Sequence, residues 1–183
     1  MKLISILLFA SLIFSFQNTD FLESPVVGFW NFQESPEIIV CDFIVPLEKV
    51  KNATKFWEKL GYKFSEVRLE KSLDECFSAE PKYGQIRIRM INSNEILEMN
   101  NMIAMTRLRS NSKNFNILSA DIIVHGFISQ KELALEHEIG HALGWKHTNV
   151  RGHIMNPVWE KIGEISKGMK YSDYCSQIYS LLR

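Results

Sequence analysis

Five short stretches of the chain have the hydrophobic and polar pattern of β-strands. They lie at residues 37–45, 64–69, 85–91, 102–109 and 117–124. The first (EIIVCDFIV) is a nearly continuous run rich in β-branched and aromatic residues, which predicts a buried strand. The second and third alternate between apolar and polar positions, as strands with one buried face do. We therefore expect a sheet of five strands.

Two further stretches repeat their apolar residues at helical spacing. Residues 47–60 carry such a stripe and precede Gly61, a typical helix stop. Residues 173–182 follow Ser172, a typical helix cap, and predict a C-terminal helix. The order of strands and helices predicts an α+β fold, in which helices cover a twisted, mixed sheet. The 183 residues and the 46% hydrophobic content indicate one domain, which we place at residues 37–183.

A third helix is predicted at about residues 130–143. Ser129 and Glu132 have the spacing of a capping box at its start. Leu135 and Ile139 supply apolar surface that would bury the helix and hold its other side chains rigid. This third helix and the helix at residues 47–60 are the two long helices that we expect to find against the sheet.

Three residues of this third helix indicate metal chemistry. His137 and His141 are four residues apart, so their imidazoles share one face of the helix and can bind a single cation. Glu138 is rotated from His137 by about 100° around the helix axis. At that position its carboxylate can take a proton from a metal-bound water without binding the metal.

A third histidine completes the candidate metal site. Gly144 accepts the left-handed conformation that ends a helix, and the resulting turn lets His147 approach the other two histidines. Three protein ligands and a water are the arrangement of a catalytic rather than a structural zinc. Core histidines are the alternative, but they would explain one histidine and not three in register with a glutamate and a glycine.

The spacing His-Glu-x-x-His-x-x-Gly-x-x-His, followed by Met155, resembles the metzincin zinc peptidases. Thr148, directly after the third histidine, and the run IMNPVW around Met155 are similar to the matrixins, the matrix metalloproteinase family. This resemblance implies a zinc endopeptidase in which Glu138 is the general base and Met155 forms the Met-turn below the metal. Pro157 and Trp159 would form the wall of the pocket for the residue after the cleaved bond.

The resemblance also suggests where a substrate binds. In matrixins the segment equivalent to residues 102–109 is the edge of the sheet above the cleft, which implies that Thr106, Arg107 and Leu108 pair with an extended peptide. An interior strand without a ligand role is the alternative, because periodicity does not separate an edge strand from a central one.

Two segments differ from vertebrate matrixins. Between residues 92 and 101 the chain lacks the His-x-Asp motif and the Asp-rich glycine loop that hold further metals there. We therefore expect one catalytic zinc and no second zinc; Glu95 and Glu98 are expected to be solvated, and calcium is not indicated, although a weak site stays an alternative. Residues 18–36 contain no cysteine and are interrupted by prolines, so we predict a short N-terminal arm or pro-segment.

The first seventeen residues are typical of a secretory signal peptide. Lys2 precedes an apolar run, Leu3 to Phe16, which is too short to span a bilayer comfortably. We therefore expect export, with a signal peptide at residues 1–17 and a secreted product. An uncleaved membrane anchor is the alternative, because the residues before Gln17 are not the small ones that signal peptidase prefers.

Cysteine count and charge limit the remaining choices. The three cysteines, Cys41, Cys76 and Cys175, allow at most one internal disulfide, and their pairing cannot be deduced from the sequence.

The net charge is zero, so nothing suggests binding to nucleic acid. The expected partner is a peptide or protein substrate, and nothing demands a second subunit, so we expect a monomer. A zinc-binding module that binds peptides without turnover is the alternative function.

Overall fold

The computed structural model describes residues 26–30, 35–41, 45–99, 102–126, 128 and 131–157. The predicted signal peptide, Trp159 and the predicted C-terminal helix at residues 173–182 lie outside these residues. Within the described part of the chain, no helix has the length and the apolar character needed to cross a membrane.

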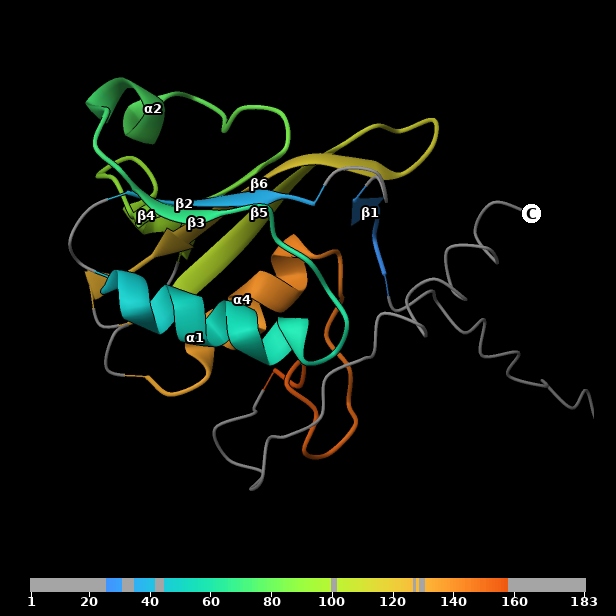
Figure 1. Cartoon of the computed structure of the whole chain (residues 1–183). Helices are drawn as coiled ribbons and strands as arrows, with labels where there is room; N and C mark the ends of the chain where they lie inside the picture. Colours follow the sequence, from blue (N-terminus) through green and yellow to red (C-terminus); the bar gives the residue numbers. More distant parts are fainter. Residues whose placement is uncertain are drawn as a thin grey trace, which may run out of the picture.

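A sheet of six strands forms the centre of the fold (Figure 1). The strands are β1 (Phe29–Trp30), β2 (Glu37–Cys41), β3 (Val67–Glu70), β4 (Gln85–Met90), β5 (Ala104–Ser110) and β6 (Asn116–Val124). Strands β3, β2, β4 and β6 are parallel neighbours in that order, while β5 runs antiparallel to β6. Among the described strands, β6 is the one partner of β5, so β5 forms an edge of the sheet. The predicted mixed α/β fold is confirmed.

The prediction of five strands was one strand short. The additional strand, β1, has two residues and pairs in parallel with the start of β6, where Phe29 lies opposite Asn116. Two residues are too few to produce a periodic pattern, so sequence analysis could not find this strand. The side chains of Phe29 and Trp30 are nevertheless buried.

Two helices, α1 (Leu47–Glu58) and α4 (Ala134–Ala142), lie against the same face of the sheet (Figure 1). Two short helices, α2 (Leu73–Phe77) and α3 (Ile96–Met99), follow β3 and β4. The apolar stripe of α1 buries Val50, Ala53 and Trp57, as its helical spacing predicts. The indole N–H of Trp57 donates to the carbonyl of Glu136 at 2.8 Å, and this bond ties α1 to α4.

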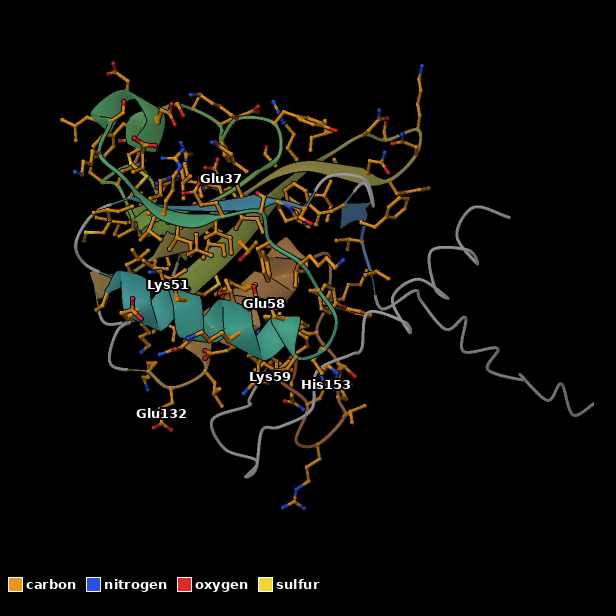
Figure 2. The ribbon with its side chains drawn as sticks, viewed as in Figure 1. Glu37, Lys51, Glu58, Lys59, Glu132 and His153 are labelled. Atoms are coloured by element: carbon orange, nitrogen blue, oxygen red, sulfur yellow. A yellow bond between two sulfur atoms is a disulfide. The ribbon has the colours of Figure 1, made fainter. Side chains whose placement is uncertain are left out.

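The main core fills the space between the sheet and these two helices, where the side chains crowd together in Figure 2. Strand residues such as Ile38, Ile88 and Ile122 meet Leu135 and Ile139 of α4, and all five are fully buried. Burying one such side chain stabilises the fold by about 1.5–3 kcal/mol before entropy is counted. The core therefore fixes the position of α4 against the sheet.

The predicted start of α4 was wrong. The helix begins at Ala134, after Leu133 in a left-handed conformation (φ 57°), and no side chain caps it. The proposed cap Ser129 lies outside the described residues, and Glu132 points into solvent from the preceding turn (Figure 2). The ammonium group of Lys49 on α1 donates to the carbonyl of Lys131 at 2.9 Å. A contact from another helix thus holds this turn, and local spacing could not predict it.

The opposite face of the sheet carries a cluster of buried charges. Arg87 and Arg89 on β4 donate to the carboxylate of Asp121 on β6, at 2.8 Å for the closest contact of each. Glu95 accepts hydrogen bonds from Arg89 at 2.6 Å and from Arg107 at 2.7 Å. Glu95 is 6% exposed, so the expectation that it is solvated was wrong; its partners are brought to it by strand pairing. The side chain of Glu98 lies outside the described residues.

A disulfide joins Cys41, at the end of β2, to Cys76 on α2, with 5.5 Å between their Cα atoms. It resolves the pairing that the sequence left open. The bond closes a loop of about 35 residues, which by the chain-entropy relation stabilises the fold by about 4 kcal/mol.

Candidate metal centre

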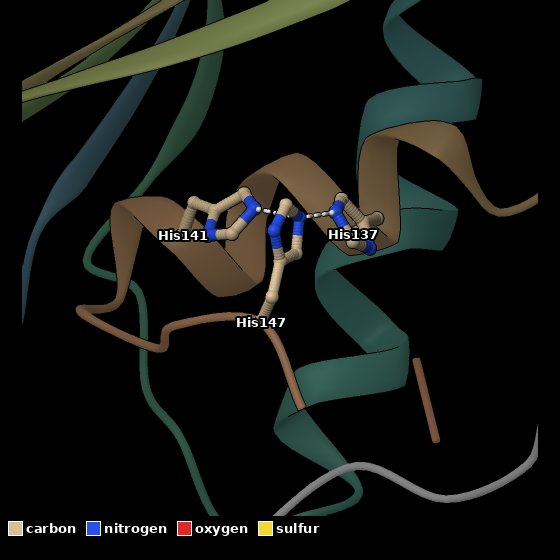
Figure 3. A group of neighbouring side chains, drawn as sticks. All are labelled: His137, His141 and His147. Atoms are coloured by element: carbon tan, nitrogen blue, oxygen red, sulfur yellow. Dashed lines mark hydrogen bonds between the residues drawn. The ribbon is translucent and has the colours of Figure 1, made fainter. Parts of the chain in front are cut away.

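The three predicted histidine ligands converge on one point. His137 and His141 lie on α4, and His147 reaches between them from the segment that follows the helix (Figure 3). The Nε2 atom of His147 is 3.1 Å from the Nε2 atoms of both other histidines. Nitrogen ligands of a tetrahedral zinc ion are about 3.3 Å apart, given Zn–N distances of about 2.0–2.1 Å. The cluster therefore has the donor type and spacing of a zinc site.

Backbone carbonyls orient two of the imidazole rings. Nδ1 of His137 is 2.6 Å from the carbonyl oxygen of Ile154, and Nδ1 of His141 is 2.7 Å from that of Trp145. A carbonyl oxygen accepts only, so Nδ1 carries the proton in both rings and the lone pair is on Nε2. Such contacts fix the tautomer and the ring orientation that a metal ligand needs.

Gly144 provides the turn that brings His147 back towards α4. Its φ is 102°, and a Cβ atom at this position would lie 2.1 Å from the carbonyl oxygen of Gly28. The predicted left-handed glycine is thus required both by its backbone angle and by the close approach of the N-terminal segment.

Residues 26–30 hold the end of α4, a role that sequence analysis missed. The N–H of Val27 donates to the carbonyl of Gly144 at 2.8 Å, and the indole of Trp30 donates to the carbonyl of Ala142 at 2.9 Å. These bonds satisfy carbonyls that a helix end leaves without a partner in the helix. The neighbouring aromatic residues Phe29 and Trp30 were the available signal, because such side chains seldom lie in a solvated arm.

Met155 packs beneath α4. It is fully buried, and a Cβ atom on Gly140 would lie 2.2 Å from its sulfur atom. The N–H of Thr148 donates to the carbonyl of Met155 at 3.0 Å, which closes the loop between His147 and this methionine. The hydrophobic floor that we predicted for Met155 stays a prediction; the residue lies against the helix that carries His137 and His141.

The imidazoles are held in their neutral form. Burial lowers the pKa of His137 to about 3 and the pKa of His141 to about 4, and it lowers the pKa of His147 as well. Burial acts this way because it disfavours the charged imidazolium. Neutral imidazole is the form that binds a metal ion, so these rings need not lose a proton to do so near neutral pH.

Glu138 lies in the same cleft and is 9% exposed. Burial raises the pKa of its carboxyl group to about 7, while a hydrogen bond from Thr106, with 2.6 Å between Oγ1 and Oε2, acts in the opposite direction. A group with a pKa near the working pH can both accept and release a proton. The arrangement therefore suits proton transfer beside the three histidines.

The histidines and Glu138 line a cleft of about 740 Å³ that runs below the edge strand β5. Of the predicted substrate-binding residues, Thr106, Leu108 and Pro157 line this cleft. The side chain of Arg107 points to the opposite face of the sheet, where it pairs with Glu95. Trp159 lies outside the described residues.

The mixed sheet, the three converging imidazoles and the buried glutamate have the character of a zinc metallopeptidase. The family model for matrixin matches residues 89–180, half of the 183-residue chain, and the chain belongs to the matrixin family. A comparison with curated proteins gives no match. Family membership supports a zinc metallopeptidase type of function that acts on peptides or proteins. Matrixins are typically extracellular, and the disulfide between Cys41 and Cys76 agrees with an oxidising compartment.

Proposed function

We propose that this chain is a secreted zinc endopeptidase. In this proposal His137, His141 and His147 hold one catalytic zinc ion and Glu138 is the general base. The observation that carries it is the convergence of three imidazoles, with Nε2 of His147 3.1 Å from Nε2 of each of the other two, in the same cleft as a buried carboxylate. A structural site would use a fourth protein ligand, whereas the cluster found among the described residues has three.

The residues of the chain have distinct parts in the proposed reaction. A bound zinc ion would supply a Lewis acid that lowers the pKa of water and polarises the scissile carbonyl. Glu138 takes the proton from the attacking water and then gives it to the leaving amine. Its burial and its raised pKa support both transfers. Met155 supports α4 from below and keeps the two helical histidines in place.

The edge strand β5 would bind the substrate. An edge strand presents backbone groups that an extended peptide can pair with, largely independently of the peptide sequence. Thr106 and Leu108 face the cleft, so a peptide paired with β5 would pass the three histidines. Pro157, together with Trp159, is proposed as the wall of the pocket for the residue after the cleaved bond, and an aromatic wall favours an apolar residue there.

The remaining parts of the proposal concern export. Residues 1–17 would act as the signal peptide and residues 37–183 as the peptidase domain. The packing of residues 26–30 against α4 suggests that the folded unit begins before residue 37. We therefore propose that any trimming of the N-terminus stops before Val26.

The proposal is tested by cleavage of a mixed peptide library, with the zinc content measured on the same protein sample. Chelator-sensitive cleavage before apolar residues is expected, with one zinc per chain. Glu138→Ala should abolish cleavage and keep the zinc, whereas His125→Ala, an exposed histidine outside the cluster, should change neither. One bound zinc without any cleavage would contradict the peptidase proposal and favour a module that binds peptides without turnover.

A further inference from the structure

The side chain of Thr106 occupies a defined place between the substrate strand and the catalytic helix. Thr106 is the third residue of β5 and lies opposite Ile122 of β6, which is fully buried. Side chains alternate along a strand, so Thr106 points to the face covered by α4, while its neighbour Arg107 points to the other face. Its hydroxyl group therefore comes from a backbone that the sheet holds in position.

This hydroxyl group contacts Glu138. Oγ1 of Thr106 is 2.6 Å from Oε2 of Glu138 and 3.3 Å from the backbone carbonyl oxygen of the same residue. A hydroxyl group has one proton, and the nearer carboxylate oxygen is the stronger acceptor, so Thr106 donates to Oε2. Among the described residues, it is the one side chain that donates to this carboxylate.

The contact limits the rotation of the Glu138 carboxylate, which has to face the attacking water in the proposed reaction. Threonine is β-branched and has few χ1 rotamers, whereas glutamate has three rotatable bonds and a broad terminal torsion. With Oε2 held by Thr106, Oε1 is the oxygen left to meet the attacking water. We propose that Thr106 is a positioning residue, whose hydroxyl group holds the general base Glu138 in the orientation for proton transfer; this inference rests on the proposed peptidase function.

The proposal has a consequence for substrate alignment. Strand β5 would pair with the peptide through its backbone and hold the general base through the Thr106 side chain. One rigid element would then set the position of both reacting partners. A misplacement of about 1 Å can reduce a rate by about 100-fold.

The test compares three substitutions in the zinc-loaded full chain. Thr106→Val keeps the shape of the side chain and removes the hydroxyl group, while Thr106→Ser keeps the hydroxyl group. Thr54→Val makes the same chemical change on α1, where the threonine bonds the carbonyl of Lys51 and not the cleft. For a peptide that the wild type cleaves, Thr106→Val should lower kcat by about 10- to 100-fold with little change in KM. Thr106→Ser should restore most of kcat, and Thr54→Val should not lower it.

A measurement without turnover tests the contact itself. In the metal-free protein, Thr106→Val should lower the urea midpoint of unfolding in the wild-type background and leave it nearly unchanged in the Glu138→Ala background. This difference isolates the interaction between the two side chains. It can be measured even if the wild type cleaves no peptide, so failure of the proposed function and failure of this inference are distinguishable.

Three results would overturn the inference. One is a wild-type kcat in Thr106→Val when the wild type is active. Another is an equal loss in Thr106→Ser, because the hydroxyl group would then not matter. The third is a raised KM with unchanged kcat, which would assign Thr106 to substrate pairing alone.

Discussion

The two faces of the sheet hold ionisable groups in opposite ways. On the face away from α4, the hydrogen bonds from Arg89 lower the pKa of Glu95 to about 2, and Asp121 is bonded to two arginines. On the face towards α4, burial raises the pKa of Glu138 to about 7, and no described cation pairs with it. One face thus pairs its carboxylates with arginines, while the other holds a carboxylate able to exchange a proton.

The charged cluster on one face therefore supports the fold, whereas the groups on the other face are suited to chemistry. A buried ion cluster, in which arginines bond both carboxylates, fixes the relation between β4, β6 and the loop that carries Glu95. Glu138 and His137 are also buried, yet the pKa shifts of Glu138 and of the three histidines come from desolvation and not from opposite charges. Such shifts in a cleft are typical of functional groups.

Removal of a histidine from the cleft should produce the largest functional effect. His141→Ala should weaken zinc binding by more than about 100-fold, because the loss of a group that merely supports a ligand already costs about 10- to 100-fold. The metal-free variant should unfold at nearly the wild-type denaturant concentration. Competition with a chelator measures the affinity, and His125→Ala is the matched control; equal zinc binding by both variants would contradict a role of His141 as a zinc ligand.

Removal of one charge from the face away from α4 should lower the stability of the fold and leave zinc binding unchanged. Asp121→Asn should lower the free energy of unfolding by about 3–5 kcal/mol, because it leaves buried arginines without their counter-charge. Zinc affinity in the folded protein should not change. Glu80→Gln removes the exposed partner of Arg109, and this control should cost about 0–1 kcal/mol. Urea titrations monitored by tryptophan fluorescence would measure both values.

The faces should also respond to acid in different pH ranges. The folded pKa of His137 is about 3, below the ordinary 6.5, so the unfolded chain binds more protons between these values. The contribution that neutral His137 makes to the stability of the metal-free protein is present above pH 6.5 and is therefore lost as the pH falls towards 3. For Glu95 the loss runs from pH 4.5 to about 2. A His137→Gln, His141→Gln variant should show a flatter stability curve between pH 6.5 and 4.5; an unchanged slope would contradict the assignment.

Glu138 should show a smaller dependence of the opposite sign. Its folded pKa is raised, so the stability present below pH 4.5 is lost as the pH rises through about 7. Glu138→Gln should therefore stabilise the metal-free protein above pH 7, by about 1–3 kcal/mol, and have little effect near pH 4. Unfolding at pH 8.5 and pH 4 measures this difference. Destabilisation at pH 8.5 would mean that the charged carboxylate has a favourable partner.

The parts of the molecule that sequence analysis predicted are those that local spacing determines. The pair His137 and His141 follows from the helical period, and the turn at Gly144 follows from backbone geometry. The start of α4 was predicted wrongly because it depends on Lys49, which is distant in the sequence. The burial of Glu95 was not predicted for the same reason, since Arg107 reaches it only when β5 and the loop are in place. The contact between Thr106 and Glu138 likewise requires the folded sheet.

We propose above all that the buried carboxylate of Glu138 transfers protons beside a zinc ion held by three histidines. The most direct test is kcat/KM of zinc-loaded wild type and of zinc-loaded Glu138→Gln, measured on one peptide chosen from the library. We expect a loss of about 10²- to 10⁴-fold in the variant, with an equal zinc content. A variant that holds one zinc and cleaves the peptide at the wild-type rate would contradict it.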